Sequence, residues 1–272
     1  MSTLHYVTES VAYVVAANMD AGADDYHLEA AVSKIFASES AWTVVDEAIQ
    51  IFGGLGIMRE TGLEKRLRDL RIFRIFEGTN DILRLFVALT GLQFAGGHLR
   101  QMVESVTKNP LAHPELLVRE GKKRTLRVFG VHSFEGANLE PLVHPELKHV
   151  AKRIDKAVGD FGVGAEFLLR KYGKSVIDEQ FRLKRVADCV IDLYASVCAL
   201  ARANRSLSDA TSSARHEAAM TRLWCDAAAD RIADNLAALD GKEARLNFQR
   251  MEEIAKNVVQ AGGVVQSHPL GV

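Results

Sequence analysis

Apolar residues recur at steps of three and four along most of this chain, which is the spacing of helices with one buried face. Such stripes run through residues 28–52, 186–200 and 220–239. Four of the five prolines fall between residues 110 and 145. Because proline costs roughly 3 kcal/mol inside a helix, the rest of the chain is free to form long helices. The pattern therefore predicts an all-α fold.

Glycines and prolines divide the predicted helices into three parts. Residues 1–108 predict a helix through Met19, a long helix over 26–52, a glycine-rich break, a short helix near 64–69, and a helix from 79 to about 107. Residues 144–272 predict four helices, with breaks near 172–173, 206–213 and 240–241. The sequence thus predicts two helical domains, 1–108 and 144–272, on either side of a linker.

The predicted linker, residues 109–143, is flexible and basic. Its basic residues alternate with apolar ones, a mixture typical either of a solvated loop or of a segment that lies on an anionic membrane surface. Two glycines interrupt any helix there, which favours the loop. The pattern alone leaves both interpretations open.

Composition narrows the function classes. A net charge of −1 and a pI near 6.8 give no indication of a nucleic-acid partner. Three cysteines without paired spacing favour a reducing compartment, and the nine histidines show no metal-ligand spacing. No apolar run is long enough to cross a membrane, and no targeting segment opens the chain.

One carboxylate, Glu77, follows a mostly apolar run and precedes Gly78 and Thr79. A carboxylate between apolar walls has a raised pKa, which suits a general base near neutral pH. The alternative is purely structural: Thr79 is the N-cap of a helix, and Asn80 and Asp81 lie in its first turn. The two interpretations are compatible.

The wider context of Glu77 matches a known family. Residues 68–84 (RDLRIFRIFEGTNDILR) resemble the C-terminal catalytic segment of the acyl-CoA dehydrogenases. Residues 50–56 (QIFGGLG) are similar to that family's flavin-contacting Gln-x-x-Gly-Gly stretch, at the family's spacing. Strings within residues 178–194 and 262–271 resemble the branch that acts on very long acyl chains and carries an extra helical C-terminal region. The resemblance is weakest over residues 97–142.

The resemblance implies flavin-dependent oxidation of long or very-long-chain acyl-CoA to trans-2-enoyl-CoA, in mitochondrial fatty acid β-oxidation. It implies that Glu77 is the catalytic base, that its backbone N–H helps to hold the thioester oxygen, and that Gly78 lies against the substrate. The residues implied to contact FAD are Gln50, Ile51, Phe52, Gly53, Gly54, Thr79, Asn80 and Asp81.

The resemblance also implies partners and a fold. The partners are a second copy of the chain in a homodimer, electron-transfer flavoprotein as electron acceptor, and the matrix side of the inner mitochondrial membrane. The fold is the helical bundle of the family's C-terminal domain, without its first helix, followed by the extra helical domain. The family's N-terminal helical domain and β-domain have no counterpart, so we expect a truncated C-terminal part.

Two alternatives remain open at this stage. One is a non-catalytic helical fragment that dimerises or associates with a membrane. The other is the family's paralogue that assists assembly of respiratory complex I. Residues 72–76 and 85–89 favour the very-long-chain enzyme over that paralogue.

Overall fold

The computed structural model describes residues 1–108 and 138–271, with side chains described outside residues 95–108. Within these ranges the chain forms α-helices and short 3₁₀ turns, and no strand. The predicted all-α fold is confirmed. The predicted linker, residues 109–143, lies outside the described residues except for its last six.

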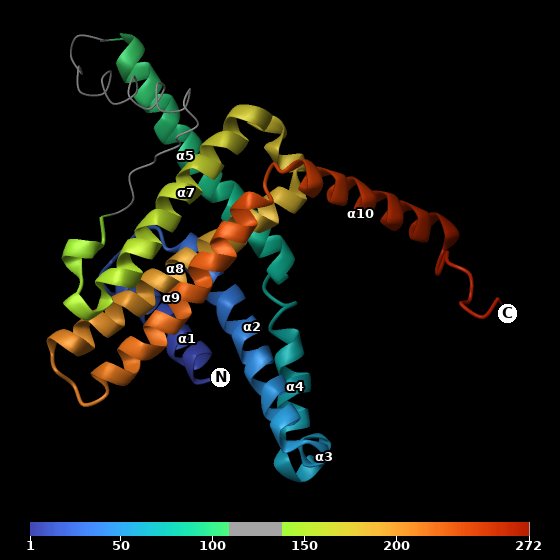
Figure 1. Cartoon of the computed structure of the whole chain (residues 1–272), viewed down its shortest axis with the longest axis horizontal. Helices are drawn as coiled ribbons and strands as arrows, with labels where there is room; N and C mark the ends of the chain where they lie inside the picture. Colours follow the sequence, from blue (N-terminus) through green and yellow to red (C-terminus); the bar gives the residue numbers. More distant parts are fainter. Residues whose placement is uncertain (109–137, 272) are drawn as a thin grey trace. The chain divides into compact units, whose positions relative to one another are not determined.

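The first part of the chain is built around one long helix, α2. The elements in order are α1 (Ser2–Asp20), α2 (His27–Phe52), α3 (Gly54–Ile57), η1 (Arg59–Thr61), α4 (Leu63–Ile72) and α5 (Asn80–Lys108). Helix α2 packs against α1, α4 and α5, and Figure 1 shows α4 alongside it. Val7, Val32 and Val87 are fully buried on α1, α2 and α5. The apolar stripe predicted over residues 28–52 is therefore a core face.

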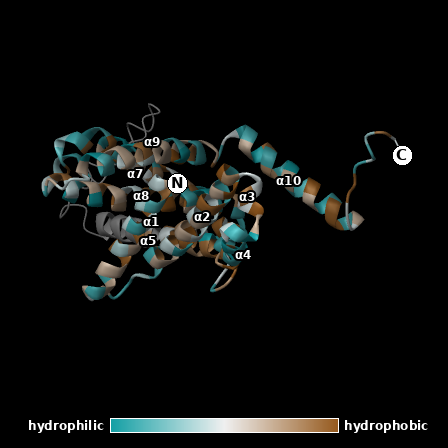
Figure 2. Cartoon of the chain, turned by 90° about the horizontal axis from the view of Figure 1, so that it is seen from below, coloured by the Kyte–Doolittle hydropathy of each residue, from teal (hydrophilic) through white to brown (hydrophobic). Residues whose placement is uncertain are grey.

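The second part contains the predicted helices and their predicted breaks. Its elements are η2 (Glu140–Leu142), η3 (Pro145–Leu147), α7 (Lys148–Tyr172), η4 (Gly173–Asp178), α8 (Gln180–Ser208), α9 (Ala214–Ala237) and α10 (Lys242–Ala261). In α10 polar and apolar positions alternate along the helix (Figure 2), and the apolar side chains Leu246, Met251 and Ile254 are exposed.

Helix α8 connects the two parts. It packs against α1, α5 and α7, and buries Leu183 and Val186 completely. These contacts lie within one compact unit, residues Met1–Leu236. Residues Ala237–Val272 form a second unit. The division into domains at residues 108 and 144 remains a prediction. In the structure, helices from before and after the linker pack against one another and share one core.

The end of α2 depends on two glycines. Gly53 ends the helix with φ 57° and ψ −136°, a conformation that residues with side chains avoid. Gly56 lies against the last turn of α2, where a Cβ would be 2.5 Å from the backbone oxygen of Ile49. Glycine at this position lets the backbone of α3 fold back onto α2 without a clash.

The three cysteines are buried in the second part and form no disulfide. Burial raises the pKa of Cys189 to about 12, of Cys198 to about 11, and of Cys225 to about 12. Their thiols are therefore protonated and shielded at neutral pH. None of the described helices is long and apolar enough to span a membrane.

Candidate functional site

Glu77 lies in a tight turn between α4 and α5. Its φ is 53°, in the left-handed region that favours glycine, and Gly78 follows with φ 91°. The backbone N–H of Asn80 donates to the carbonyl of Arg74 (3.1 Å), which closes the turn. Thr79 caps α5, since its Oγ1 accepts from the N–H of Ile82 (3.3 Å). The N-cap interpretation of Thr79 is confirmed.

A lysine from α2 contacts the side of this turn that leads into α5. The Nζ of Lys34 donates to the carbonyl oxygen of Gly78 and to Oδ1 of Asn80, each at 2.8 Å. The Asn80 side chain is buried, and its Nδ2 lies 3.0 Å from both Ser38 Oγ and Glu39 Oε1. These contacts hold the start of α5 on the face of α2.

The same face of α2 carries an ion-pair network. Arg84 donates to both oxygens of Glu39 (2.7 and 2.8 Å) and through Nε to Asp188 of α8 (2.7 Å). Burial alone would raise the pKa of Glu39, but the hydrogen bonds and charge of Arg84 hold it below its usual value. Burial likewise works to lower the pKa of Arg84, and the two carboxylates raise it well above its usual value. The network connects α2, α5 and α8 next to the Glu77 turn.

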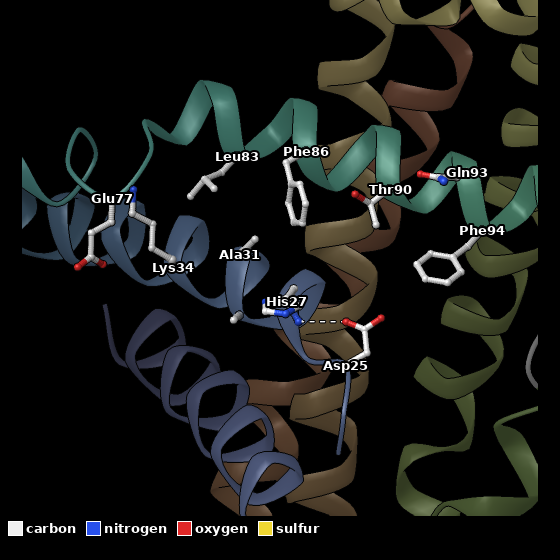
Figure 3. A pocket seen from close by; sticks show the side chains of 11 residues that line it. Asp25, His27, Ala31, Lys34, Glu77, Leu83, Phe86, Thr90, Gln93 and Phe94 are labelled. Carbon is white, nitrogen blue, oxygen red and sulfur yellow. Dashed lines mark hydrogen bonds between the residues drawn. The ribbon is translucent and has the colours of Figure 1, made fainter. Parts of the chain in front are cut away.

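Glu77 also lines one end of an open cleft between α2 and α5, with a volume of about 1100 Å³. Figure 3 shows Glu77 beside Lys34 at that end, and Phe86 and Phe94 further along α5. Asp25 lies toward the other end, with its carboxylate accepting from the backbone N–H of His27 (3.4 Å). The walls are mainly apolar, and the charged side chains of Lys34 and Glu77 lie side by side at the end next to the turn.

The described residues do not enclose Glu77. Its side chain is exposed, and the four apolar residues that precede it are 39–50 % exposed. These four are Ile72, Phe73, Ile75 and Phe76. The low-dielectric surroundings expected from the sequence therefore require atoms from outside the described part of the chain.

The other predicted flavin-contacting residues lie away from this turn. Gln50, Ile51, Phe52, Gly53 and Gly54 are all exposed at the end of α2. Gln50 follows Lys34 by sixteen residues, which corresponds to roughly 24 Å along a helix. Within one chain, the fold thus keeps the Gln50 segment separate from Glu77. Thr79, Asn80 and Asp81 are next to Glu77, but the Asn80 side chain is committed to internal hydrogen bonds.

Sequence reasoning missed Lys34, Glu39 and Arg84. The first two are five residues apart on α2, and each reaches a residue more than 40 positions later. Their only local signal is that they are charged residues beside a core stripe. Among the described residues, no three His, Cys, Asp or Glu side chains gather as they would around a metal ion.

Two family models match this chain. The one described as "Acyl-CoA dehydrogenase, C-terminal domain" matches residues 1–92, and the one described as "ACAD9/ACADV, C-terminal domain" matches residues 145–264. The Glu77 turn lies within the first match, and α7, α8 and α9 lie within the second. The chain belongs to the acyl-CoA dehydrogenase family.

Individual relatives indicate the branch. The human very long-chain specific acyl-CoA dehydrogenase, a mitochondrial protein, is 50 % identical over 272 residues, which is all of this chain and 41 % of that protein. The Bos taurus counterpart is also 50 % identical, again over 41 % of its length. The chain therefore matches the C-terminal part of the very long-chain enzymes, and spans about two fifths of their length.

A solved structure shares the fold. An acyl-CoA dehydrogenase from Bacillus anthracis, solved in complex with FAD, superimposes with a TM-score of 0.65 at 25 % sequence identity. The match covers 92 % of this chain and 43 % of that one. Both parts of the all-α arrangement are thus found together in a flavin-binding relative.

Proposed function

We propose that this chain is the base-bearing C-terminal part of a flavin-dependent acyl-CoA dehydrogenase for long and very-long-chain acyl-CoA, acting in mitochondrial fatty acid β-oxidation. The observation that carries the proposal is the turn that presents Glu77. Its backbone is held in a left-handed conformation by contacts from α2, at the end of a cleft. Residues kept in such conformations cluster at functional sites.

In the proposed reaction Glu77 removes a proton from the α-carbon of the acyl thioester. The electron pair of that C–H bond forms the new double bond to the β-carbon. A bound FAD would supply the acceptor for the β-hydrogen, which leaves as hydride. The backbone N–H of Glu77 donates to the thioester carbonyl oxygen, on which negative charge develops. Gly78, without a side chain, allows the thioester to approach the backbone.

The residues assigned to FAD differ in how well they fit that role. A Cβ at Gly53 or Gly54 would meet nothing within 4 Å, so the end of α2 is open to a large ligand. Asp81 is exposed at the start of α5 and is equally accessible. Asn80 fits a supporting role instead, because its side chain is buried and already hydrogen-bonded. We therefore assign flavin contact to the Gln50 segment, Thr79 and Asp81.

We infer that the working form is a homodimer. Within one chain, the Gln50 segment lies far from Glu77, so the two are not expected to contact the same flavin molecule. This separation supports contact of the Gln50 segment with a flavin that is held mainly by the partner chain. Five large apolar side chains in this segment and directly after it are more than half exposed, as expected of a surface that another chain covers. They are Ile51, Phe52, Leu55, Ile57 and Met58.

The remaining partners follow the family. We propose electron-transfer flavoprotein as the electron acceptor and the matrix side of the inner mitochondrial membrane as the location. The mitochondrial names of the very long-chain relatives support this location. Contact of residues 109–143 with the membrane stays a prediction.

A second candidate function is a non-catalytic helical part that associates with other chains. The exposure of Glu77 and of the apolar residues before it favours this candidate for the chain by itself. A carboxylate without an enclosing apolar pocket is hydrated, and the reaction then lacks the water-excluded surroundings that it needs.

One experiment separates the two candidates. The purified chain is incubated with excess FAD, passed through gel filtration, and its absorbance spectrum is recorded, followed by an assay with palmitoyl-CoA and an artificial electron acceptor. Retained flavin and activity that Glu77→Gln abolishes, without loss of flavin, would support the dehydrogenase. Glu60→Gln, an exposed carboxylate on η1, is the matched control and should change neither property. A colourless, inactive chain would favour the non-catalytic candidate.

A further inference from the structure

The turn that carries Glu77 is held in a conformation that its sequence does not favour. Two successive residues have positive φ, 53° at Glu77 and 91° at Gly78. Glycine adopts such angles freely, but a glutamate in the left-handed region is strained by its Cβ. Strained residues persist only where surrounding contacts determine their conformation. The turn closes on itself through the hydrogen bond from the Asn80 N–H to the Arg74 carbonyl, and its side-chain contacts come from α2.

Lys34 contacts the part of the turn that follows Glu77. Its ammonium donates to the carbonyl oxygen of Gly78, directly after Glu77, and to the Asn80 side chain at the start of α5. Asn80 cannot swing away, because Ser38 and Glu39 hold its Nδ2. A charged donor makes stronger hydrogen bonds than a neutral one. One side chain of α2 thus holds the carbonyl of the residue that follows the proposed base.

The charges around Lys34 are consistent with this role. Burial holds the pKa of Lys34 below its usual value, although the nearby carboxylates of Glu77 and Glu39 work to raise it. Figure 3 shows the Lys34 and Glu77 side chains next to one another at the end of the cleft. The ammonium therefore has two carboxylates nearby, and backbone and amide acceptors that keep it in place.

We propose that Lys34 is a positioning residue for Glu77: it holds the carbonyl of Gly78 and the side chain of Asn80 so that the turn keeps the carboxylate aimed at the substrate's α-carbon. This inference rests on the proposed function of Glu77. Lys34 acts through the backbone of the turn and touches no reacting atom. Its removal is expected to loosen the turn rather than to change substrate binding.

The first arm of the test measures the turn directly by amide hydrogen exchange of the purified chain. In Lys34→Met, we expect amides of Asn80 to Leu83 to exchange about tenfold faster or more, while those of α8 change less than about twofold. Lys34→Arg, which keeps a charged donor, should exchange nearly as the original chain does. Lys65→Met on α4 is the matched control. That lysine is exposed and only pairs with Asp69 at 3.9 Å.

Two outcomes of this arm would overturn the proposal. Unchanged exchange in the turn of Lys34→Met would mean that other contacts hold Glu77 in place. An equal increase across α1, α5 and α8 would mean that Lys34 stabilises the fold as a whole. Neither outcome depends on whether the chain is catalytically active.

The second arm uses the palmitoyl-CoA assay. Lys34→Met is expected to lower kcat about a hundredfold with an unchanged KM, because a misaligned base slows the chemical step without weakening binding. Recovery of kcat in Lys34→Arg would support positioning, and a raised KM with unchanged kcat would contradict it. If the original chain shows no dehydrogenation, the proposed function fails for this chain, and the exchange arm still decides the role of Lys34.

Discussion

Replacing Arg84 with methionine is expected to destabilise the compact unit by breaking its ion-pair network. Arg84 is 13 % exposed and pairs with Glu39 and Asp188, which are 33 % and 19 % exposed. Methionine keeps most of the apolar stem of arginine, so the main loss is charge pairing. Two half-buried carboxylates on neighbouring helices are then left without their shared partner.

The magnitude follows from the burial of the three groups. Removing one partner of a buried pair costs about 3–5 kcal/mol, and the partial exposure of Glu39 places the estimate near the lower end, about 3 kcal/mol. For a unit of this size each kcal/mol corresponds to about 2–4 °C, so the Tm should fall by about 6–12 °C. Thermal unfolding followed by far-UV circular dichroism measures this shift.

The matched control for this measurement is Arg205→Met. Arg205 is 86 % exposed and pairs at 3.5 Å with Asp209, the residue directly after α8, so its loss should cost less than about 1 kcal/mol. A double-mutant cycle of Arg84→Met with Asp188→Asn should show a combined loss smaller than the sum of the single losses. The network would have no stabilising role if Arg84→Met and Arg205→Met lowered the Tm equally.

Three further outcomes are expected. Gly56→Ala should cost about 1–3 kcal/mol in urea unfolding, because its Cβ meets backbone at the end of α2, whereas Gly54→Ala, with open space around it, should change stability by less than about 0.5 kcal/mol. Equal effects of the two changes would contradict the packing of α3. Because the pKa of Glu39 is lowered from 4.5 in the folded chain, its contribution to stability is present above that pH and is lost as the pH falls through the folded-state value. Glu39→Gln should therefore destabilise the chain at neutral pH and have little effect in strong acid. The three buried cysteines should resist iodoacetamide in the native chain and react only in denaturant, as a thiol count before and after unfolding would show.

Local signals predicted the helices well because local chemistry determines them. The stripe over residues 28–52 ends where Gly53 adopts a conformation that glycine favours, and α2 ends there. Thr79 was predicted as an N-cap from its position before a polar pair, and its hydroxyl does accept from the first turn of α5. These features depend on neighbours within four residues, so spacing alone is sufficient.

Long-range contacts could not be predicted in the same way. Arg84 and Asp188 are 104 residues apart, and periodicity identifies the buried face of each helix without saying which helix it meets. The contact of Lys34 with Gly78 is hidden for the same reason. The apolar run before Glu77 was expected to enclose the carboxylate, but those side chains point to surfaces that the described residues leave open.

Stability and the proton abstraction proposed for Glu77 favour different residues at position 77. The left-handed backbone there disfavours glutamate by about 1–2 kcal/mol relative to glycine, and asparagine tolerates it better than most residues. A lineage of this chain released from catalysis would therefore gain conformational energy by losing the carboxylate. In such a lineage we expect glycine or asparagine to replace Glu77 early, because the replacement increases the stability of the folded chain.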